Sequence, residues 1–237
     1  MDIYALSDLH LSLGQNKSMD IFGAEWKNHH LKIQKNWNSV VKSCDLVLIP
    51  GDISWAMNIK DAEIDCDFIS NLNGRKVLLR GNHDYWWDSV SKVRSRFKDL
   101  NFIQNDMFVI ENIAVCGSRG WKTPIDESFD ENTDRKIFER ELIRYRLSLD
   151  CAKRQNIENI VFMSHFPILA NGCETEFSNI LEEYKVKKAV YGHIHGKENF
   201  KNIYEGMKNG ISYSLVSADY IDFKPIKIYD SEVKTWL

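Results

Sequence analysis

The chain has 237 residues, of which 43% are hydrophobic and 27% are charged, and its formal net charge is −3. This length is sufficient for a buried core, and the composition is that of an ordinary globular protein. The small negative charge excludes a global basic surface and argues against a nucleic-acid partner. No apolar run approaches the roughly 18–20 residues of a membrane-spanning helix, so we expect no membrane partner.

The N-terminus and the cysteines both bear on the compartment. Residues 1–8 contain no basic region and lead directly into an apolar run, which predicts that no signal peptide is present. The five cysteines are an odd number, and none forms a C-x-x-C pair. We therefore expect reduced thiols and a cytoplasmic protein.

Five short apolar runs each stop at a turn that is followed by a polar residue. They span residues 3–6, 45–49, 76–79, 159–163 and 188–191. Runs of four or five β-rich residues without alternation are typical of strands that are buried on both faces. Helical spacing of apolar residues occurs at 26–42, 60–72, 90–97 and 132–154. The alternation of strands and helices predicts a layered α/β fold.

Shorter strands complete the predicted fold. Residues 102–104, 108–110 and 113–116 resemble antiparallel strands, with a hairpin turn at Glu111-Asn112. Residues 211–216 and 226–229 are predicted to form another meander. These strands favour a mixed two-sheet core with helices outside it over a purely parallel sheet. No linker or repeat interrupts the chain, so we expect a single domain across residues 1–237.

Asp, Asn and His residues follow the five predicted strands in a fixed order. Five of the seven histidines fall within these stretches, which are Asp8-Leu9-His10, Gly51-Asp52, Gly81-Asn82-His83-Asp84, His165 and Gly192-His193-Ile194-His195. Because α/β folds place their active sites at the carboxyl ends of strands, we expect these side chains to converge.

The spacing within the stretches suits metal binding. In an extended backbone, Asp8 and His10 project to the same side, so that both can bind one ion. His193 and His195 have the same spacing, and we expect their rings to face different ions or different sides of one ion. The Asp52 carboxylate has two oxygens and can bridge two cations.

The remaining donors are the amide oxygen of Asn82 and the imidazole of His165. Hard oxygens and imidazoles without a thiolate suit two divalent transition-metal ions, with Mn, Fe, Zn, Ni and Co all left open. A lone D-x-H occurs often by chance, and a lone histidine is more often a hydrogen-bonded core residue. The complete ordered set therefore carries the prediction, and no single stretch does.

The ordered set resembles the pattern of the calcineurin-like metallophosphoesterases, which is D-x-H, G-D, G-N-H-[DE], H and G-H-x-H. The resemblance extends from Asp8 to His195. It implies a four-layer α/β/β/α sandwich of two mixed β-sheets flanked by helices. It also implies two metal sites that share Asp52. One would contain Asp8, His10, Asp52 and His195, and the other would contain Asp52, Asn82, His165 and His193.

The same resemblance implies that His83 is the catalytic histidine, which contacts the phosphate and protonates the leaving oxygen. Asp84 would orient the His83 ring and raise its basicity. The pattern predicts a dinuclear-metal-dependent phosphohydrolase that cleaves a phosphomonoester or a phosphodiester by attack of a metal-bridging hydroxide. The predicted partner is a small phosphorylated substrate, with a nucleotide as one candidate.

Two other functions remain as alternatives. The first is a metal-dependent nuclease, which the charge balance disfavours. The second is a non-catalytic scaffold on the same fold, which the intact set of ligands disfavours. The sequence leaves the oligomeric state and the choice between monoester and diester open.

Several residues near the stretches have two interpretations. Arg119 lies in a glycine-flanked loop and either contacts a phosphate or is a solvated surface arginine. Phosphoprotein phosphatases carry an Asp-Arg pair after the second motif, and this pair is absent here, because Gly51-Asp52 is followed by Ile53-Ser54-Trp55-Ala56. Arg80 is predicted to form a structural ion pair, and His29-His30 to lie at the surface. The aromatic residues of the loops are expected to anchor them rather than stack on a base, and they are Trp55, Trp86, Trp87 and Trp121.

Overall fold

Two six-stranded sheets form the centre of the protein in a computed structural model that describes residues 1–15 and 17–237. The first sheet contains, in spatial order, β12 (Thr235–Trp236), β11 (Ile226–Asp230), β1 (Ile3–Ala5), β2 (Leu46–Pro50), β3 (Arg75–Leu79) and β4 (Asn101–Phe102). The second contains β5 (Met107–Ile110), β6 (Ile113–Ser118), β7 (Ile160–Ser164), β8 (Lys188–Tyr191), β10 (Ile211–Leu215) and β9 (Gly206–Lys208).

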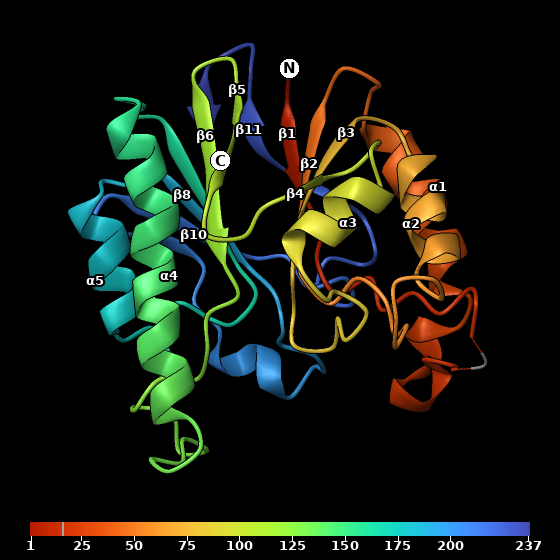
Figure 1. The fold of residues 1–237 in the computed structure, drawn as a ribbon, viewed down its shortest axis with the longest axis horizontal. Coiled ribbons are helices and arrows are strands. Elements are labelled where there is room, and N and C mark those ends of the chain that lie inside the picture. The colour runs from red at the N-terminus through yellow and green to blue at the C-terminus, as the bar shows by residue number, and fades with distance from the viewer. Residues whose placement is uncertain (16) are drawn as a thin grey trace.

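Helices cover the outer face of each sheet (Figure 1). The first sheet is covered by α1 (His29–Val40), α2 (Glu63–Ser70) and α3 (Val90–Arg96). The second is covered by α4 (Arg135–Arg154) and α5 (Glu176–Glu183). The predicted four-layer α/β/β/α sandwich with two mixed sheets is therefore confirmed.

Strand β2 shows why the predicted runs are apolar throughout. Leu46 and Leu48 pack in the core between the two sheets, whereas Val47 and Ile49 pack against the helices. Successive side chains point to opposite faces of a strand, and both faces are buried here. The strand therefore needs an apolar residue at every position.

The pairing of the short strands differs in part from the prediction. The β5–β6 hairpin is confirmed, and Glu111 takes a positive φ of 51° in its turn. The predicted antiparallel strand at 102–104 is instead β4, which pairs in parallel with β3. The predicted meander at 211–229 is also wrong, because β10 is parallel to β8 and β11 is antiparallel to β1 in the other sheet. The apolar pattern of a strand does not specify its partner.

The helices differ from the prediction mainly at their ends. The first begins at His29 because residues Ala24–Trp26 form a 3-10 helix, η2, which follows another, η1 (Asp20–Phe22). Helix α5 was not predicted, although Thr175 and Ser178 form a capping box at its start. A third 3-10 helix, η3, spans Asn199–Asn202. Within the described ranges, no helix is long and apolar enough to cross a membrane.

Candidate metal centre

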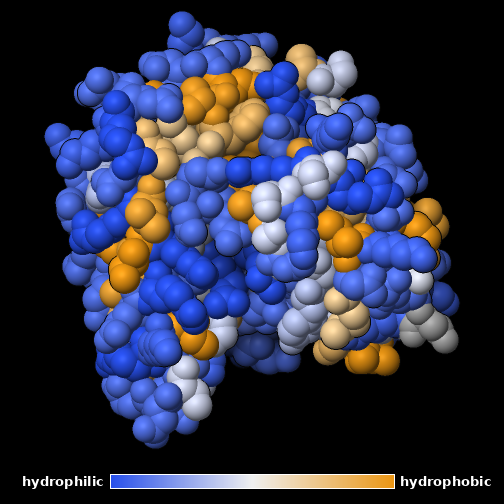
Figure 2. Space-filling view, viewed as in Figure 1, coloured by the Kyte–Doolittle hydropathy of each residue, from blue (hydrophilic) through white to orange (hydrophobic). Residues whose placement is uncertain are grey.

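The five Asp/His stretches meet at the carboxyl ends of β1, β2, β3, β7 and β8. Backbone hydrogen bonds join these loops, since Asp8 N donates to the Gly51 carbonyl at 3.0 Å and Gly192 N donates to the His165 carbonyl at 3.1 Å. Viewed as in Figure 1, the surface is notched at its lower edge, between the segment before α4 and the N-terminal 3-10 helices (Figure 2). The parallel strands β1, β2 and β3 of one sheet and β6, β7 and β8 of the other direct their carboxyl ends toward this edge.

The first cluster contains Asp8, His10 and His195, whose ligand atoms all lie within 4.8 Å of one another. The Nε2 atoms of His10 and His195 are 3.4 Å apart, and Asp8 Oδ1 is 3.4 Å from His195 Nε2. Asp8 and His10 are buried. Two ring nitrogens and a carboxylate oxygen that converge in this way form a ligand set for one cation.

The second cluster contains Asp52, His165 and His193, also with ligand atoms within 4.8 Å of one another. The amide oxygen of Asn82 lies 2.6 Å from His165 Nε2. Asp52 Oδ2 is 3.4 Å from His165 Nε2 and 3.7 Å from His10 Nε2 of the first cluster. The Asp52 carboxylate therefore lies between the clusters, and the structure brings all seven expected ligands together.

The backbone of four of these residues is left-handed. The φ angle is 57° at Asp8, 43° at His10, 51° at Asp52 and 73° at His193. Non-glycine residues rarely adopt this conformation, which costs on the order of 1–3 kcal/mol and is concentrated at functional sites. The extended backbone expected between Asp8 and His10 is therefore absent. A turn at each residue, rather than the period of a strand, directs both side chains to one cluster.

Two glycines allow the backbone to approach the carboxylates. A Cβ atom at Gly81 would overlap Oδ1 of Asp52, and one at Gly192 would overlap Oδ2 of Asp8. Any larger residue would displace a carboxylate that belongs to the site. This contact explains why glycine precedes Asn82 and His193.

Hydrogen bonds from outside the clusters orient the ligands. His165 Nδ1 bonds to the Pro50 carbonyl at 3.0 Å, and His195 Nδ1 bonds to Asp219 Oδ1 at 2.8 Å. Each bond leaves the Nε2 atom directed into its cluster, as in known metal sites. Asp219 was not predicted. It lies four residues after the end of β10, with Ser217 between them, so the position of a polar residue at a strand end indicates it only weakly.

The buried carboxylates attract positive charge to the clusters. Burial opposes protonation of His165, but the charge and hydrogen bond of Asp52 raise its pKa to about 9. Burial likewise opposes protonation of His195, but hydrogen bonds and charge from Asp219 and Asp8 raise its pKa to about 10. Burial lowers the pKa of His10 to about 4. Each cluster thus contains one histidine whose positive charge is stabilised by carboxylates. The oxygen and imidazole donors of both clusters fit divalent metal ions.

Comparison with known proteins identifies the family. The family model described as calcineurin-like phosphoesterase matches residues 1–197. The chain belongs to the calcineurin-like phosphoesterase family. Membership implies divalent metal ions, which agrees with the two Asp/His clusters.

Two solved structures share the fold of this calcineurin-like phosphoesterase at low sequence identity. TT1561 of Thermus thermophilus is 11% identical with a TM-score of 0.58, and the match covers 95% of this chain and 96% of that chain. Phosphopantetheinyl hydrolase (PptH) from Mycobacterium tuberculosis is 15% identical with a TM-score of 0.51, and the match covers 91% of this chain and 88% of that chain. At these identities the likeness concerns the fold alone.

One sequence relative is a phage protein. Gene 66 protein of Mycobacterium phage L5 is 39% identical over 80 residues, which are 33% of this chain and 37% of that protein. The chain therefore matches little more than a third of the length of this relative.

His83 lies beside both clusters of the calcineurin-like phosphoesterase. It is half-buried, its backbone N–H donates to Asp52 Oδ1 at 2.8 Å, and its ring lies 4.6 Å from the Trp55 ring. Its Nδ1 atom is buried and has no hydrogen-bond partner among the described residues. Trp55 also stacks on His10 at 4.9 Å, so this tryptophan positions histidines of the site.

Asp84 has different partners from those expected. Its carboxylate accepts hydrogen bonds from backbone N–H groups at 2.7–3.1 Å and from Trp86 Nε1 at 3.0 Å. The backbone donors belong to Ile53, Ser54 and Gly81. Within the described chain, no hydrogen bond joins Asp84 to the His83 ring, because the carboxylate points back beneath the loops. Asp84 therefore fixes the Asp52 and Asn82 loops to each other.

Two other expectations about charged residues are corrected. His29 is buried, not at the surface, and its ring nitrogens lie 3.1 Å from the Trp26 carbonyl and 3.0 Å from the Leu9 carbonyl. It therefore supports the loop that carries Asp8 and His10. Arg80 forms no ion pair with any residue that the structure describes.

Arg119 is partly enclosed. Its guanidinium lies 3.8 Å from the buried Glu141 carboxylate and 4.7 Å from the Trp121 ring centroid. It is therefore not a freely solvated arginine. Trp86 and Trp87 are buried in the core, as the packing interpretation predicts, whereas Trp121 is half-buried and lines a cavity.

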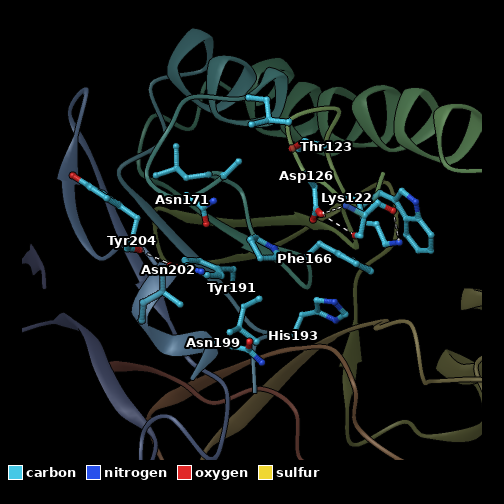
Figure 3. A pocket seen from close by; sticks show the side chains of 18 of the residues that line it. Lys122, Thr123, Asp126, Phe166, Asn171, Tyr191, His193, Asn199, Asn202 and Tyr204 are labelled. Atoms are coloured by element: carbon cyan, nitrogen blue, oxygen red, sulfur yellow. Dashed lines mark hydrogen bonds between the residues drawn. The ribbon is translucent and has the colours of Figure 1, made fainter. Parts of the chain in front are cut away.

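That cavity adjoins the metal ligand candidate His193 and has a volume of about 540 Å³. Figure 3 shows the His193 ring at one side and the side chains of Asn171, Asn199 and Tyr204 around the rest. Lys122 and Asp126, on the segment before α4, lie across the cavity from Tyr204. The cavity opens beside the second cluster and combines amides, aromatic rings and few charges.

Proposed function

We propose that this protein is a metal-dependent phosphohydrolase that acts on a phosphomonoester or phosphodiester of a small molecule. The observation that carries the proposal is the position of the Asp52 carboxylate between two Asp/His clusters. Phosphoryl transfer needs charge neutralisation at two oxygens, and paired ligand sets of this kind provide it. Family membership supports the same reaction class.

We further propose that the two clusters hold two divalent ions. Asp8, His10, Asp52 and His195 would hold one ion. Asp52, Asn82, His165 and His193 would hold the other. Such ions, when bound, supply Lewis acidity that lowers the pKa of water and neutralises charge on phosphoryl oxygens. Manganese is the first ion to test among Mn, Fe, Zn, Ni and Co.

We assign the proton transfer to His83. Its Nδ1 is buried, and its Nε2 makes no hydrogen bond to a described residue, so Nε2 is the nitrogen available to a leaving oxygen. The backbone bond to Asp52 keeps the ring beside the clusters. A histidine in this position can donate a proton as the phosphorus–oxygen bond breaks.

The cavity beside His193 would take the organic part of the substrate. Its volume of about 540 Å³ is within the range of small-molecule sites. Lys122 is its only lysine or arginine among the described lining residues, which suits a small ligand better than a polyanion. A nucleotide is one candidate because aromatic rings and side-chain amides can bind a base. Phosphopantetheine is another compound to test, because the structurally similar M. tuberculosis protein is a phosphopantetheinyl hydrolase.

We also propose a reducing compartment, the cytoplasm. All five cysteines are free thiols, and none is paired with another. Reduced thiols are the usual state of cytoplasmic cysteines.

The deciding experiment is a matched assay of p-nitrophenyl phosphate and bis(p-nitrophenyl) phosphate. The purified protein is stripped with a chelator and reloaded separately with Mn, Fe, Zn, Ni or Co. We expect metal-dependent release of nitrophenol from at least one compound, followed by selectivity in a nucleotide panel. Hydrolysis of single-stranded DNA in preference to every small compound would favour the nuclease. No hydrolysis of any compound with any metal would favour the scaffold.

A further inference from the structure

A second, smaller cavity of about 60 Å³ shares no lining residue with the large one and is lined by three arginines. Arg80 reaches it from the end of β3, Arg119 from the end of β6 and Arg144 from helix α4. Asn105, in the turn after β4, contributes an amide to the wall. Guanidinium groups repel one another, so their gathering around one hollow needs compensation.

The charges around this arginine cavity do not balance within the described chain. Glu141 accepts from Arg144 Nη1 at 2.6 Å and lies 3.8 Å from Arg119 Nη2. Asp106, which follows Asn105, is already paired with Arg94 at 2.6 Å. Arg80 has no carboxylate partner among the described residues. Three positive groups thus face one negative group.

Hydrogen bonding at this cavity is also incomplete. Six buried side-chain atoms have no partner within the described residues, and three of them belong to residues that line it. These are Arg80 Nε, Arg119 Nε and Asn105 Oδ1. Buried polar groups in folded proteins almost always have a partner. A polar occupant would satisfy them, and water alone would leave the excess charge uncompensated.

We propose that the arginine cavity binds an oxyanion of the size and charge of a phosphate group. A water needs roughly 10–15 Å³ of such space, so a cavity of about 60 Å³ accommodates the oxygens of a tetrahedral anion. Guanidinium groups bind phosphate through paired N–H donors. The Asn105 amide can accept from a protonated phosphate oxygen or donate to an ionised one.

The site borders the metal ligands through the backbone. Arg80 directly precedes Gly81-Asn82, and the Arg119 carbonyl accepts from His165 N at 3.0 Å. The occupant is therefore either a free phosphate ion or a second phosphate group of the substrate. Both present the same chemistry to the arginines. The binding site itself does not depend on the proposed hydrolysis.

The test is calorimetric titration of the metal-loaded protein with inorganic phosphate at low ionic strength. The variants are Arg80→Gln and Arg119→Lys, and the control is Arg146→Gln, an exposed arginine of α4 that pairs with Glu183 at 2.6 Å. We expect the wild type and the control to share a binding component that both cavity variants weaken about tenfold or more, since charged hydrogen bonds are lost. Arg119→Lys keeps the charge and provides a second variant if Arg80→Gln does not fold.

A second titration separates the two sources of phosphate. Adenosine 3′,5′-bisphosphate is compared with AMP in the wild type and in Arg80→Gln. If the site takes a second phosphate group of the substrate, the bisphosphate binds more tightly, and Arg80→Gln removes that advantage. If it takes a free ion, only the inorganic phosphate titration changes. Identical isotherms for the wild type, both cavity variants and the control would overturn the proposal, and this heat measurement is independent of turnover.

Discussion

The Asp219 carboxylate lies 2.8 Å from Nδ1 of His195 and holds the imidazole with Nε2 directed toward Asp8 and His10. Asp219 also accepts from the backbone N–H of Gly196 at 3.1 Å. Asp219 bonds to the proposed metal ligand His195 and does not itself belong to the first cluster. It therefore contributes to the orientation and basicity of the His195 ring.

Replacing Asp219 should therefore weaken one metal site. We expect Asp219→Asn to lower the affinity of the first cluster for Mn by roughly 10–100-fold, because such partners orient a ligating imidazole. Stepwise calorimetric titration with Mn measures this affinity. Asp222→Asn is the matched control, since Asp222 is exposed and lies three residues away. Equal affinities in the two variants would contradict the role of Asp219.

Asp52→Asn should affect both clusters at once. The carboxylate lies near His165 of one cluster and His10 of the other, and an amide carries no charge to neutralise two cations. We expect metal content, measured by mass spectrometry after gel filtration, to fall from two ions toward none. Asp8→Asn should mainly remove the ion of the first cluster, to which Asp8 belongs. A variant Asp52→Asn that retains both ions would refute the bridging assignment.

His83→Ala should separate catalysis from metal binding. The ring lies beside the clusters but is not among the proposed ligands, so metal content should be retained. We expect turnover to fall by roughly 10²–10⁴-fold, the usual contribution of a general acid. Tyr85→Phe is the control, because that exposed ring lies 6.3 Å from His83. Turnover that matches the wild type would exclude His83 as the proton donor.

Asp84→Ala should lower the free energy of unfolding and leave the pH dependence of the reaction rate nearly unchanged. The substitution leaves three buried backbone N–H groups and the Trp86 indole without their acceptor. At about 1–3 kcal/mol for each unsatisfied donor, the free energy of unfolding should fall by several kcal/mol. Urea denaturation measures the change. Unaltered stability with a shifted pH–rate profile would instead support a direct action of Asp84 on His83.

Lys188 should give the protein a distinctive pH dependence. The side chain is buried and donates to Ser212 and Ser214 hydroxyls at 3.0 and 2.7 Å, and burial lowers its pKa from 10.5 to about 8. Between pH 8 and 10.5 the unfolded chain binds more protons than the folded one, so folding becomes more favourable as pH rises. Below pH 8 both states are protonated and this dependence ends.

The control for this effect is Lys188→Met, which lacks the titrating group. We expect the stability of the wild type relative to this variant to rise by about 2 kcal/mol between pH 7 and pH 10, from 1.36 kcal/mol for each unit of pKa difference. Denaturation of both proteins at each pH cancels the titration of other groups. A constant difference between them would show that Lys188 is not desolvated in the folded state.

Much of the fold and the site could be predicted from local pattern. Strands buried on both faces must be apolar at every position, as in β2, and a polar residue one to three positions after such a strand lies at the carboxyl edge of the sheet. Asp8, Asp52, Asn82, His165 and His193 all obey this rule. Their convergence could therefore be predicted without knowledge of any long-range contact.

Tertiary structure alone decided which residues face one another. The Asp84 carboxylate points away from His83 because it accepts hydrogen bonds from three backbone N–H groups of neighbouring loops. His29 is buried because its ring bonds to the Leu9 carbonyl, 20 residues away in the sequence. Arg80 lacks the expected ion pair because its end of β3 faces Arg119 and Arg144, not a carboxylate. The physical reason is common to all three. A local pattern determines whether a segment is a strand or a helix and which of its faces are buried. The hydrogen-bond partner of a polar group belongs to a segment distant in sequence, about which the local pattern contains no information.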